Sequence, residues 1–198
     1  TTGADNTAVG KSALTANTTA VSNTAVGSGS LIAATTGFDN TTMGVNSGYG
    51  ITTGDNNLLL GVSAGRASSP SGNITTEDNR ICLGNNSITH SYVKVDWTVT
   101  SDERDKMNFG EVPHGLSFVN DLQPVKFDFK KSRDNATPHG KTKYGFKAQD
   151  ILALEGDSPI IIDNENEDSL KVTNSHLIPV LVKAIQELSA KVEALENA

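Results

Sequence analysis

The sequence predicts an N-terminal all-β repeat stalk, a trimeric β-helix or β-roll, followed by a small α+β domain that ends in a coiled-coil helix. Three observations predict this fold class. Residues 1–101 contain only 10 charged side chains, whereas residues 102–198 contain 29. A short apolar motif recurs at a fixed spacing in the first half, and a heptad stripe of apolar residues runs along the last segment. We therefore expect a stalk over residues 1–100 and a second domain over residues 101–198.

The stalk is built from a motif that recurs every seventeen positions, at Asn6, Asn23, Asn40 and Asn57. Its copies are Asn6-Thr-Ala-Val-Gly10, Asn23–Gly27, Asn40–Gly44 and Asn57–Gly61, with a degenerate copy at Asn79–Gly84 after an insert over 66–78. Brief apolar runs bounded by Asn and Gly are typical of short strands joined by tight turns, in which Asn and Gly supply positive-φ positions. One unit buries little apolar surface, so we expect it to pack on successive coils or on sister chains around an axis. A disordered linker would not require apolar residues at a fixed spacing.

The repeat, followed by Ser12-Ala-Leu14 and its counterparts, resembles the repeats of bacteriophage tail-fibre stalks and of trimeric bacterial adhesin heads. This resemblance covers residues 5–88. It implies an extended homotrimeric shaft that contacts a receptor on the host-cell surface.

The segments after the repeats change in character. Residues 91–100 alternate apolar and polar side chains, which predicts a strand leading into the charged stretch Ser101–Lys106. The second half then predicts, in order, a helix over 116–122, a strand over 125–129, a polar hairpin loop over 130–143, a strand that turns into a helix over 144–154, and short strands at 160–162 and 170–172.

The last segment predicts a helix over about residues 175–196, with Asn174 or Ser175 as its N-cap and Pro179 in its first turn. Its apolar residues alternate three and four positions apart, as in the a and d positions of a coiled coil: Ile178, Leu181, Ile185, Leu188, Val192 and Leu195. The alternative is one amphipathic helix packed on its own domain. We favour self-association because the stripe is unbroken, although the pattern does not select three strands over two.

Four blocks in the second half carry a second resemblance. They are Ser101-Asp-Glu-Arg-Asp-Lys106, Gly115–Val125, Tyr144–Asp150 and His176–Leu188. In order and spacing they resemble the C-terminal intramolecular chaperone domain of phage tail spikes and fibres, of the endosialidase type, over residues 101–195. Lys147 departs from the pattern, at a position where an apolar residue is expected. The resemblance implies a virion tail fibre or spike whose chaperone domain drives trimerisation and is released in the infected host cytoplasm.

The resemblance also implies self-cleavage by a serine–lysine dyad, with Ser101 as the nucleophile and Lys106 as the base. A serine hydroxyl is a poor nucleophile until a base takes its proton. A lysine is such a base only when neutral, and its pKa is about 10.4 in water, so burial has to lower that pKa by several units. The base would therefore exist only after the domain folds, and cleavage would follow assembly.

Two bonds flank the serine. The Oγ atom of Ser101 reaches the carbonyl of Thr100 through a five-membered ring, which favours cleavage between Thr100 and Ser101. The bond between Ser101 and Asp102 is the close alternative. Neighbouring carboxylates would hold the lysine charged, so they have to point away or pair with Arg104. The competing interpretation of this stretch is a solvated turn with a Ser or Asp cap.

Composition excludes several other functions. The net charge of −7 argues against nucleic acid as a partner. No apolar run approaches the roughly 20 residues of a membrane helix, so we expect no membrane partner. The scattered histidines and the single Cys82 predict no metal site and no cofactor. The acidic run over 163–168 is read as a solvated turn, with an oxygen-ligand cation site as the alternative. The rival function is a trimeric adhesin-like fibre whose second domain is permanent and non-catalytic.

Overall fold

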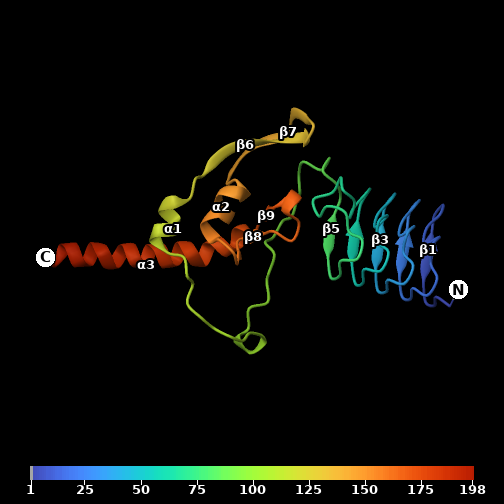
Figure 1. Ribbon diagram of the computed structural model, residues 1–198, viewed down its shortest axis with the longest axis horizontal. Helices are drawn as coiled ribbons and strands as arrows, with labels where there is room; N and C mark the ends of the chain where they lie inside the picture. The colour runs from blue at the N-terminus through green and yellow to red at the C-terminus, as the bar shows by residue number, and fades with distance from the viewer. Residues whose placement is uncertain (1) are drawn as a thin grey trace. The chain divides into compact units, whose positions relative to one another are not determined.

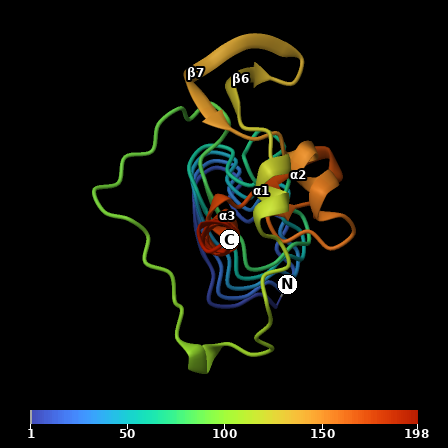
Figure 2. The same ribbon diagram turned by 90° about the vertical axis from the view of Figure 1, so that its left-hand side faces the viewer.

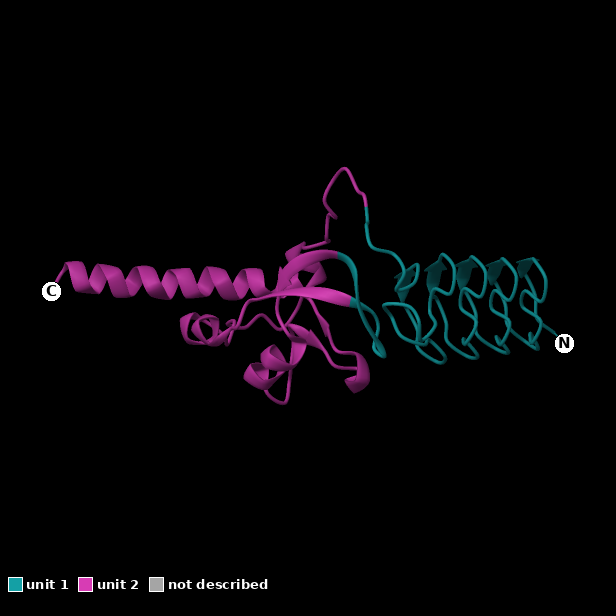
Figure 3. Cartoon of the chain, turned by 90° about the horizontal axis from the view of Figure 1, so that it is seen from above, with its two compact units in different colours: residues 1–91, 130–140 teal, residues 92–129, 141–198 magenta. Residues whose placement is uncertain are grey.

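The structure is a computed structural model and describes residues 2–198. The chain forms two compact units (Figure 3): Thr1–Ser91 with Lys130–Gly140, and Tyr92–Phe129 with Lys141–Ala198. The first contains the repeats, and the second contains the charged stretch and most of the helices. Each unit has its own hydrophobic core.

The repeats form a β-solenoid, whose coils are nearly superimposed when viewed along the stack (Figure 2). Its five strands pair in parallel and in chain order (Figure 1): β1 (Thr7–Val9), β2 (Thr24–Val26), β3 (Thr41–Met43), β4 (Leu58–Leu60) and β5 (Ile81–Leu83). The register pairs Thr7 with Thr24 and Thr24 with Thr41, so one copy of the sequence repeat is one coil. The neighbours that each unit needs are thus successive coils of the same chain.

The solenoid core is built from the middle residue of each strand and from the turns that follow. Side chains alternate between the two faces of a strand, so only the middle residue of these short strands points inward. Leu59 at the centre of β4 is fully buried, and Cys82 occupies the same position in β5. The largest buried residues of the turns are Leu31 and Ile51.

The asparagine of the repeat has a different role from the one predicted. The repeat glycines do adopt positive φ, for example 132° at Gly27 and 136° at Gly44. Asn40, however, is fully buried, and its Nδ2 donates to Asn23 Oδ1 at 3.0 Å and to Gly54 O at 2.8 Å. Its Oδ1 accepts from Asn57 N at 3.0 Å. The asparagines therefore form a buried ladder that satisfies polar groups between coils.

The fifth copy of the repeat is confirmed as strand β5, but its alignment shifts by one residue. The register pairs Ile81 with Leu58, so Arg80 takes the place of the ladder asparagine. Its backbone amide donates to Asn57 Oδ1 at 3.0 Å and completes the ladder.

The strand predicted over residues 91–100 is wrong. This segment contains no strand, and all of its residues are exposed. Among the backbone hydrogen bonds of residues 2–198, none involves residues 93–101. An alternating pattern makes a strand only when a neighbouring strand supplies hydrogen-bond partners, and the described chain places none beside this segment.

The elements after the repeats follow the predicted order, with a longer hairpin. They are α1 (Leu116–Asp121), β6 (Val125–Ser132), β7 (Asn135–Gly145), α2 (Ala148–Glu155), β8 (Ile162–Asp163), β9 (Lys171–Val172) and α3 (Leu177–Glu196), with short 3-10 turns η1 (Glu103–Asp105), η2 (Glu167–Ser169) and η3 (Asn174–His176). The predicted loop over 130–143 is mostly strand, because β6 and β7 pair across nearly its whole length.

The core of the second unit lies between α1, α2, β8 and the beginning of α3. Its buried residues are Phe118, Ile151, Ile161, Ile162, Leu177 and Val180. Two carboxylates hold this core in place. Glu155 accepts from the backbone amides of residues 160, 161 and 162 at 2.8–3.0 Å. Glu187 of α3 accepts from Leu116 N at 2.8 Å and so caps α1, whose N-cap is Gly115.

Helix α3 is confirmed, but its predicted N-cap is not. Asn174 and Ser175 form the turn η3, and His176 takes the N-cap position without a side-chain cap. The Nδ1 atom of His176 instead lies 2.8 Å from Ile160 O.

The heptad stripe of α3 does not pack on its own domain. The helix buries a different set of residues, namely Leu177, Val180 and Ala184. The stripe residues are 43–78% exposed. An amphipathic helix packed on its own domain would bury this stripe, so the described chain leaves it available for association.

Candidate functional site

The candidate site is a tight turn in the segment between the solenoid and α1. The turn η1 begins after Asp102, whose side chain accepts from Arg104 N at 2.9 Å. Two backbone bonds close it, from Asp105 N to Asp102 O at 3.2 Å and from Lys106 N to Glu103 O at 3.1 Å. Such a turn brings the residues on either side of it together.

Ser101 and Lys106 are the two residues that this turn brings into contact. The Nζ atom of Lys106 donates to the Oγ atom of Ser101 at 2.6 Å. In this hydrogen bond the lysine nitrogen donates and the serine oxygen accepts. For the serine to become a nucleophile the direction has to reverse, with a neutral amine accepting the hydroxyl proton. The distance already suits that transfer.

The carboxylate of Asp102, which follows Ser101 in the sequence, is paired with an arginine. Arg104 Nη2 lies 2.6 Å from Asp102 Oδ2, and Arg104 Nε lies 3.0 Å from Asp102 Oδ1. The hydrogen bonds from the Arg104 side chain, and then from its backbone amide, lower the pKa of Asp102 below its ordinary value. This bidentate pairing leaves Lys106 as the partner of Ser101 and turns Asp102 away from it.

The contact between Ser101 and Lys106 is exposed in the single chain. All residues from 101 to 110 are exposed. The same holds for large apolar side chains before and after the turn, with Trp97 and Val99 each 79% exposed, Met107 80% and Phe109 69%. A folded monomer seldom leaves such side chains in water, and here they lie within a few residues of Ser101 and Lys106 along the chain.

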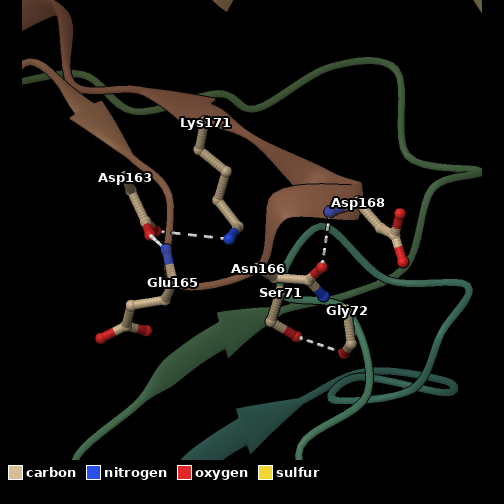
Figure 4. Close-up of polar contacts among 7 residues, drawn as sticks. All are labelled: Ser71, Gly72, Asp163, Glu165, Asn166, Asp168 and Lys171. Carbon is tan, nitrogen blue, oxygen red and sulfur yellow. Dashed lines mark hydrogen bonds and ion pairs between the residues drawn. The ribbon is translucent and has the colours of Figure 1, made fainter. Parts of the chain in front are cut away.

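The other candidate that the sequence offered is the acidic run over 163–168. The described residues contain no cluster of metal-ligating side chains. The acidic run over 163–168 is a set of local turns (Figure 4), in which Asp163 pairs with Lys171 at 3.3 Å and Asn166 accepts from Asp168 N at 3.0 Å. Figure 4 also draws the hydrogen bond that Ser71 Oγ donates to Gly72 O at 3.0 Å.

Within residues 2–198, none of the helices combines the length and the apolar character that crossing a bilayer requires.

Sequence reasoning missed the link between α1 and α3. Glu187 caps α1 from 71 residues away, and Lys183 lies 3.8 Å from Glu111. The available signal was Gly115, which precedes a helix without offering a capping side chain. Lys147, which departs from the resemblance, is exposed at the N-cap of α2 and pairs with Asp150 at 3.7 Å. An apolar residue is not required there.

Comparison with known proteins identifies the domain that contains this turn. Residues 101–156 match the model of a peptidase family described as chaperone of endosialidase. This part of the chain is a chaperone-of-endosialidase domain. Such domains are intramolecular chaperones typical of phage tail fibres, they act in trimeric fibres, and the family is one of self-cleaving peptidases. No curated protein and no solved structure matches the chain.

Proposed function

We propose that this chain is the C-terminal part of a phage tail fibre or spike whose domain from residue 101 onward drives homotrimerisation and then releases itself. The cut lies next to Ser101, with Ser101 as the nucleophile and Lys106 as the base. The observation that carries the proposal is the 2.6 Å contact between Lys106 Nζ and Ser101 Oγ at the start of the chaperone-of-endosialidase domain. The mature fibre would then contact a receptor on the host surface.

The reaction begins with a proton transfer. A neutral Lys106 amine takes the hydroxyl proton of Ser101, and Oγ attacks the carbonyl carbon of Thr100 through a five-membered ring. The bond between that carbon and the Ser101 nitrogen breaks as the nitrogen receives the proton back from Lys106. The product is an ester between Thr100 and Ser101 Oγ. Water hydrolyses the ester, leaving a carboxylate on Thr100 and a free amine on Ser101.

Assembly would supply the water-poor surrounding that Lys106 lacks in the single chain. A lysine acts as a base only as a neutral amine, so the reaction needs a water-poor surrounding that favours the uncharged form. The exposed apolar side chains of residues 92–99, together with Met107 and Phe109, offer such a surrounding once sister chains pack on them. The exposed heptad stripe of α3 would bring those chains together. Cleavage would then occur only after the trimer has assembled.

The proposal is tested by substituting both members of the pair. We expect Ser101→Ala and Lys106→Met to fold and assemble but to remain intact on a denaturing gel, with cleavage slowed at least about 1,000-fold. The matched controls are Ser91→Ala and Lys94→Met, which change the same residue types in the exposed segment before the turn. Undiminished cleavage in Ser101→Ala would remove the proposed nucleophile.

Mass spectrometry of the cleaved fragments decides between the two bonds. Cleavage before Ser101 gives a C-terminal fragment that begins with Ser101, whereas cleavage after it gives one that begins with Asp102. An intact mass for the assembled wild-type chain would favour the rival function, a permanent oligomerisation domain on an adhesin-like fibre.

A further inference from the structure

The outer face of the solenoid sheet becomes fully apolar at its C-terminal end. Each strand points two side chains outward, and none of these ten is charged: Thr7, Val9, Thr24, Val26, Thr41, Met43, Leu58, Leu60, Ile81 and Leu83. Strands β1, β2 and β3 each pair one threonine with one apolar residue. Strands β4 and β5 carry only apolar residues, and we call Leu58, Leu60, Ile81 and Leu83 the outer patch.

In the described chain the Ile81 and Leu83 side chains of the outer patch are open to solvent, whereas Leu58 and Leu60 are half-buried. Ile81 is 73% exposed and Leu83 is 53% exposed, and the adjacent Val62 is 53% exposed. The register pairs Leu58 with Ile81 and Leu60 with Leu83, so the four side chains form one continuous surface. A sheet with a solvated face normally alternates apolar residues inward with polar residues outward, and the outer patch breaks that rule.

The acidic residues of the solenoid repeats lie outside the strands that form this face. The acidic residues of the repeats all lie two to four positions before a strand, at one corner of the coil: Asp5, Asp39, Asp55, Glu77 and Asp78. Two solenoids that meet through their outer faces would therefore bring apolar side chains together without opposing these carboxylates. The strands of a second copy are also about 4.8 Å apart, so the rows of outward side chains on the two copies have the same spacing and can pack against each other.

The outer face is small, which indicates that it contributes to association only together with the second domain. Five strands span about 20 Å and three residues span about 10 Å, which gives a few hundred Å² per copy. A stable interface buries about 800 Å² per partner. The outer face is thus too small to hold copies together alone, but it can set their register once another element has gathered them.

We propose that the outer patch is the surface through which the solenoids of sister copies meet, and that it fixes their register. The proposal rests on the proposed assembly into trimers. A slip of one coil would place Thr41 of one copy against Leu58 of another and leave Ile81 without an apolar partner. A slip of two coils would place Met43 of one copy against Leu83 of another and leave both Leu58 and Ile81 without one. The in-register arrangement is the one that buries all four residues, so the apolar end of the face selects it.

The test uses the full chain with Ser101→Ala, so that it stays intact, and Cys82→Ala, so that no native thiol remains. Alanine is already present at the position of Cys82 in the equivalent β1 and β2 sites, Ala8 and Ala25. We expect Leu83→Cys in this background to form a disulfide between chains under mild oxidation, because residues near a symmetry axis meet their own copies. The control is Thr76→Cys, an exposed residue at the acidic corner, which we expect to cross-link roughly tenfold more slowly.

Register is read by co-expressing two chains, one with Leu83→Cys and one with Met43→Cys. These positions lie two strands apart, about 10 Å. We expect only same-position cross-links, and we expect Ile81→Thr to reduce the Leu83→Cys cross-link roughly tenfold while Val9→Thr does not. Circular dichroism checks that each variant is folded.

Two outcomes would overturn the inference, and light scattering distinguishes them. If the chains associate but Leu83→Cys cross-links no faster than Thr76→Cys, or if Leu83→Cys and Met43→Cys cross-link with each other, the outer patch does not set the register and the proposed assembly stands. If the chains do not associate at all, both this inference and the proposed trimer fail.

Discussion

The core of the solenoid buries its apolar side chains, whereas the segment that follows the solenoid leaves its apolar side chains exposed. In the solenoid Leu31, Ile51 and Leu59 are fully buried, and the polar groups between coils are satisfied by the asparagine ladder. In the segment after it, Trp97 and Val99 are each 79% exposed. The contrast shows that the solenoid closes a core of its own, whereas the segment after it buries none of its residues from 91 to 100.

The two parts differ because solenoid strands pair with other strands of the same chain, whereas the segment after the solenoid does not. A solenoid strand pairs with the strand of the next repeat along the chain, so each coil closes on the one before it. The segment over residues 92–110 has no such repeat beside it. The alternating pattern over 91–100 is typical of a strand, but among the described residues no strand pairs with residues 93–101. We infer that sister chains supply this neighbour, which would place the proposed self-cleaving turn where assembly can control it.

The largest expected effect separates buried from exposed apolar residues. Leu59→Ala empties part of the solenoid core and should lower the free energy of unfolding by about 2–5 kcal/mol. In the unassembled chain Ile185→Ala removes a side chain of α3 that is 63% exposed, so it should change that free energy by about 0.5 kcal/mol or less. Denaturant unfolding measures both. Equal losses would contradict the division between a self-sufficient solenoid and an open helix.

The next effect tests whether the ladder, and not only the apolar core, holds the coils together. Asn40→Ala should cost about 2 kcal/mol, because it leaves the buried Gly54 carbonyl and the Asn57 amide without partners. Asn86→Ala changes an exposed asparagine of the same unit and serves as the control. A loss no greater than that of the control would show that the ladder is dispensable.

A smaller effect concerns the second unit. A Cβ atom on Gly115 would collide with the Glu187 carboxylate that caps α1, so Gly115→Ala should cost about 1 kcal/mol. At Gly110 an added Cβ meets no atom within 4 Å, which makes Gly110→Ala the matched control. Glu187→Gln keeps an acceptor and should retain most of the stability. Thermal unfolding of the three variants gives the comparison.

The smallest effect is a pH dependence in the insert of the solenoid. Burial of Glu77 raises its pKa. Hydrogen bonds from the backbone amides of Thr75, Glu77 and Thr76, and from the Thr75 hydroxyl, together lower the pKa by more than burial raises it. The pKa of Glu77 therefore lies below its ordinary value of 4.5. A carboxyl whose folded pKa is lowered stabilises the fold above its unfolded pKa and loses that contribution as pH falls through the folded pKa. Glu77→Gln should therefore lose stability at neutral pH and depend less on pH below about 4.5.

The control for this measurement is Glu193→Gln, which changes a carboxylate on the exposed part of α3. Unfolding midpoints are compared at neutral and acidic pH. If Glu77→Gln and the wild type show the same acid-induced loss, the hydrogen bonds to Glu77 make no measurable contribution.

Much of the candidate site could be predicted from the sequence, because its residues lie close together along the chain. Ser101 and Lys106 are five positions apart, and the turn between them needs only local hydrogen bonds. The pairing of Asp102 with Arg104 follows from the same short range. The exposure of the site could not be predicted in this way, since burial depends on surfaces that are distant in the sequence or belong to another chain.

By itself the sequence determined the coil length, the order of the elements after the repeats and the heptad spacing of α3, because periodicity is a property of the chain that any fold has to respect. Only the tertiary structure decided that the repeat asparagines stack in a buried ladder, that residues 91–100 have no strand partner among residues 2–198, and that α3 turns Leu177 and Val180, and not its heptad stripe, toward its own domain. The physical reason is that a spacing specifies which residues share a face, whereas the free energy of burial depends on what covers that face.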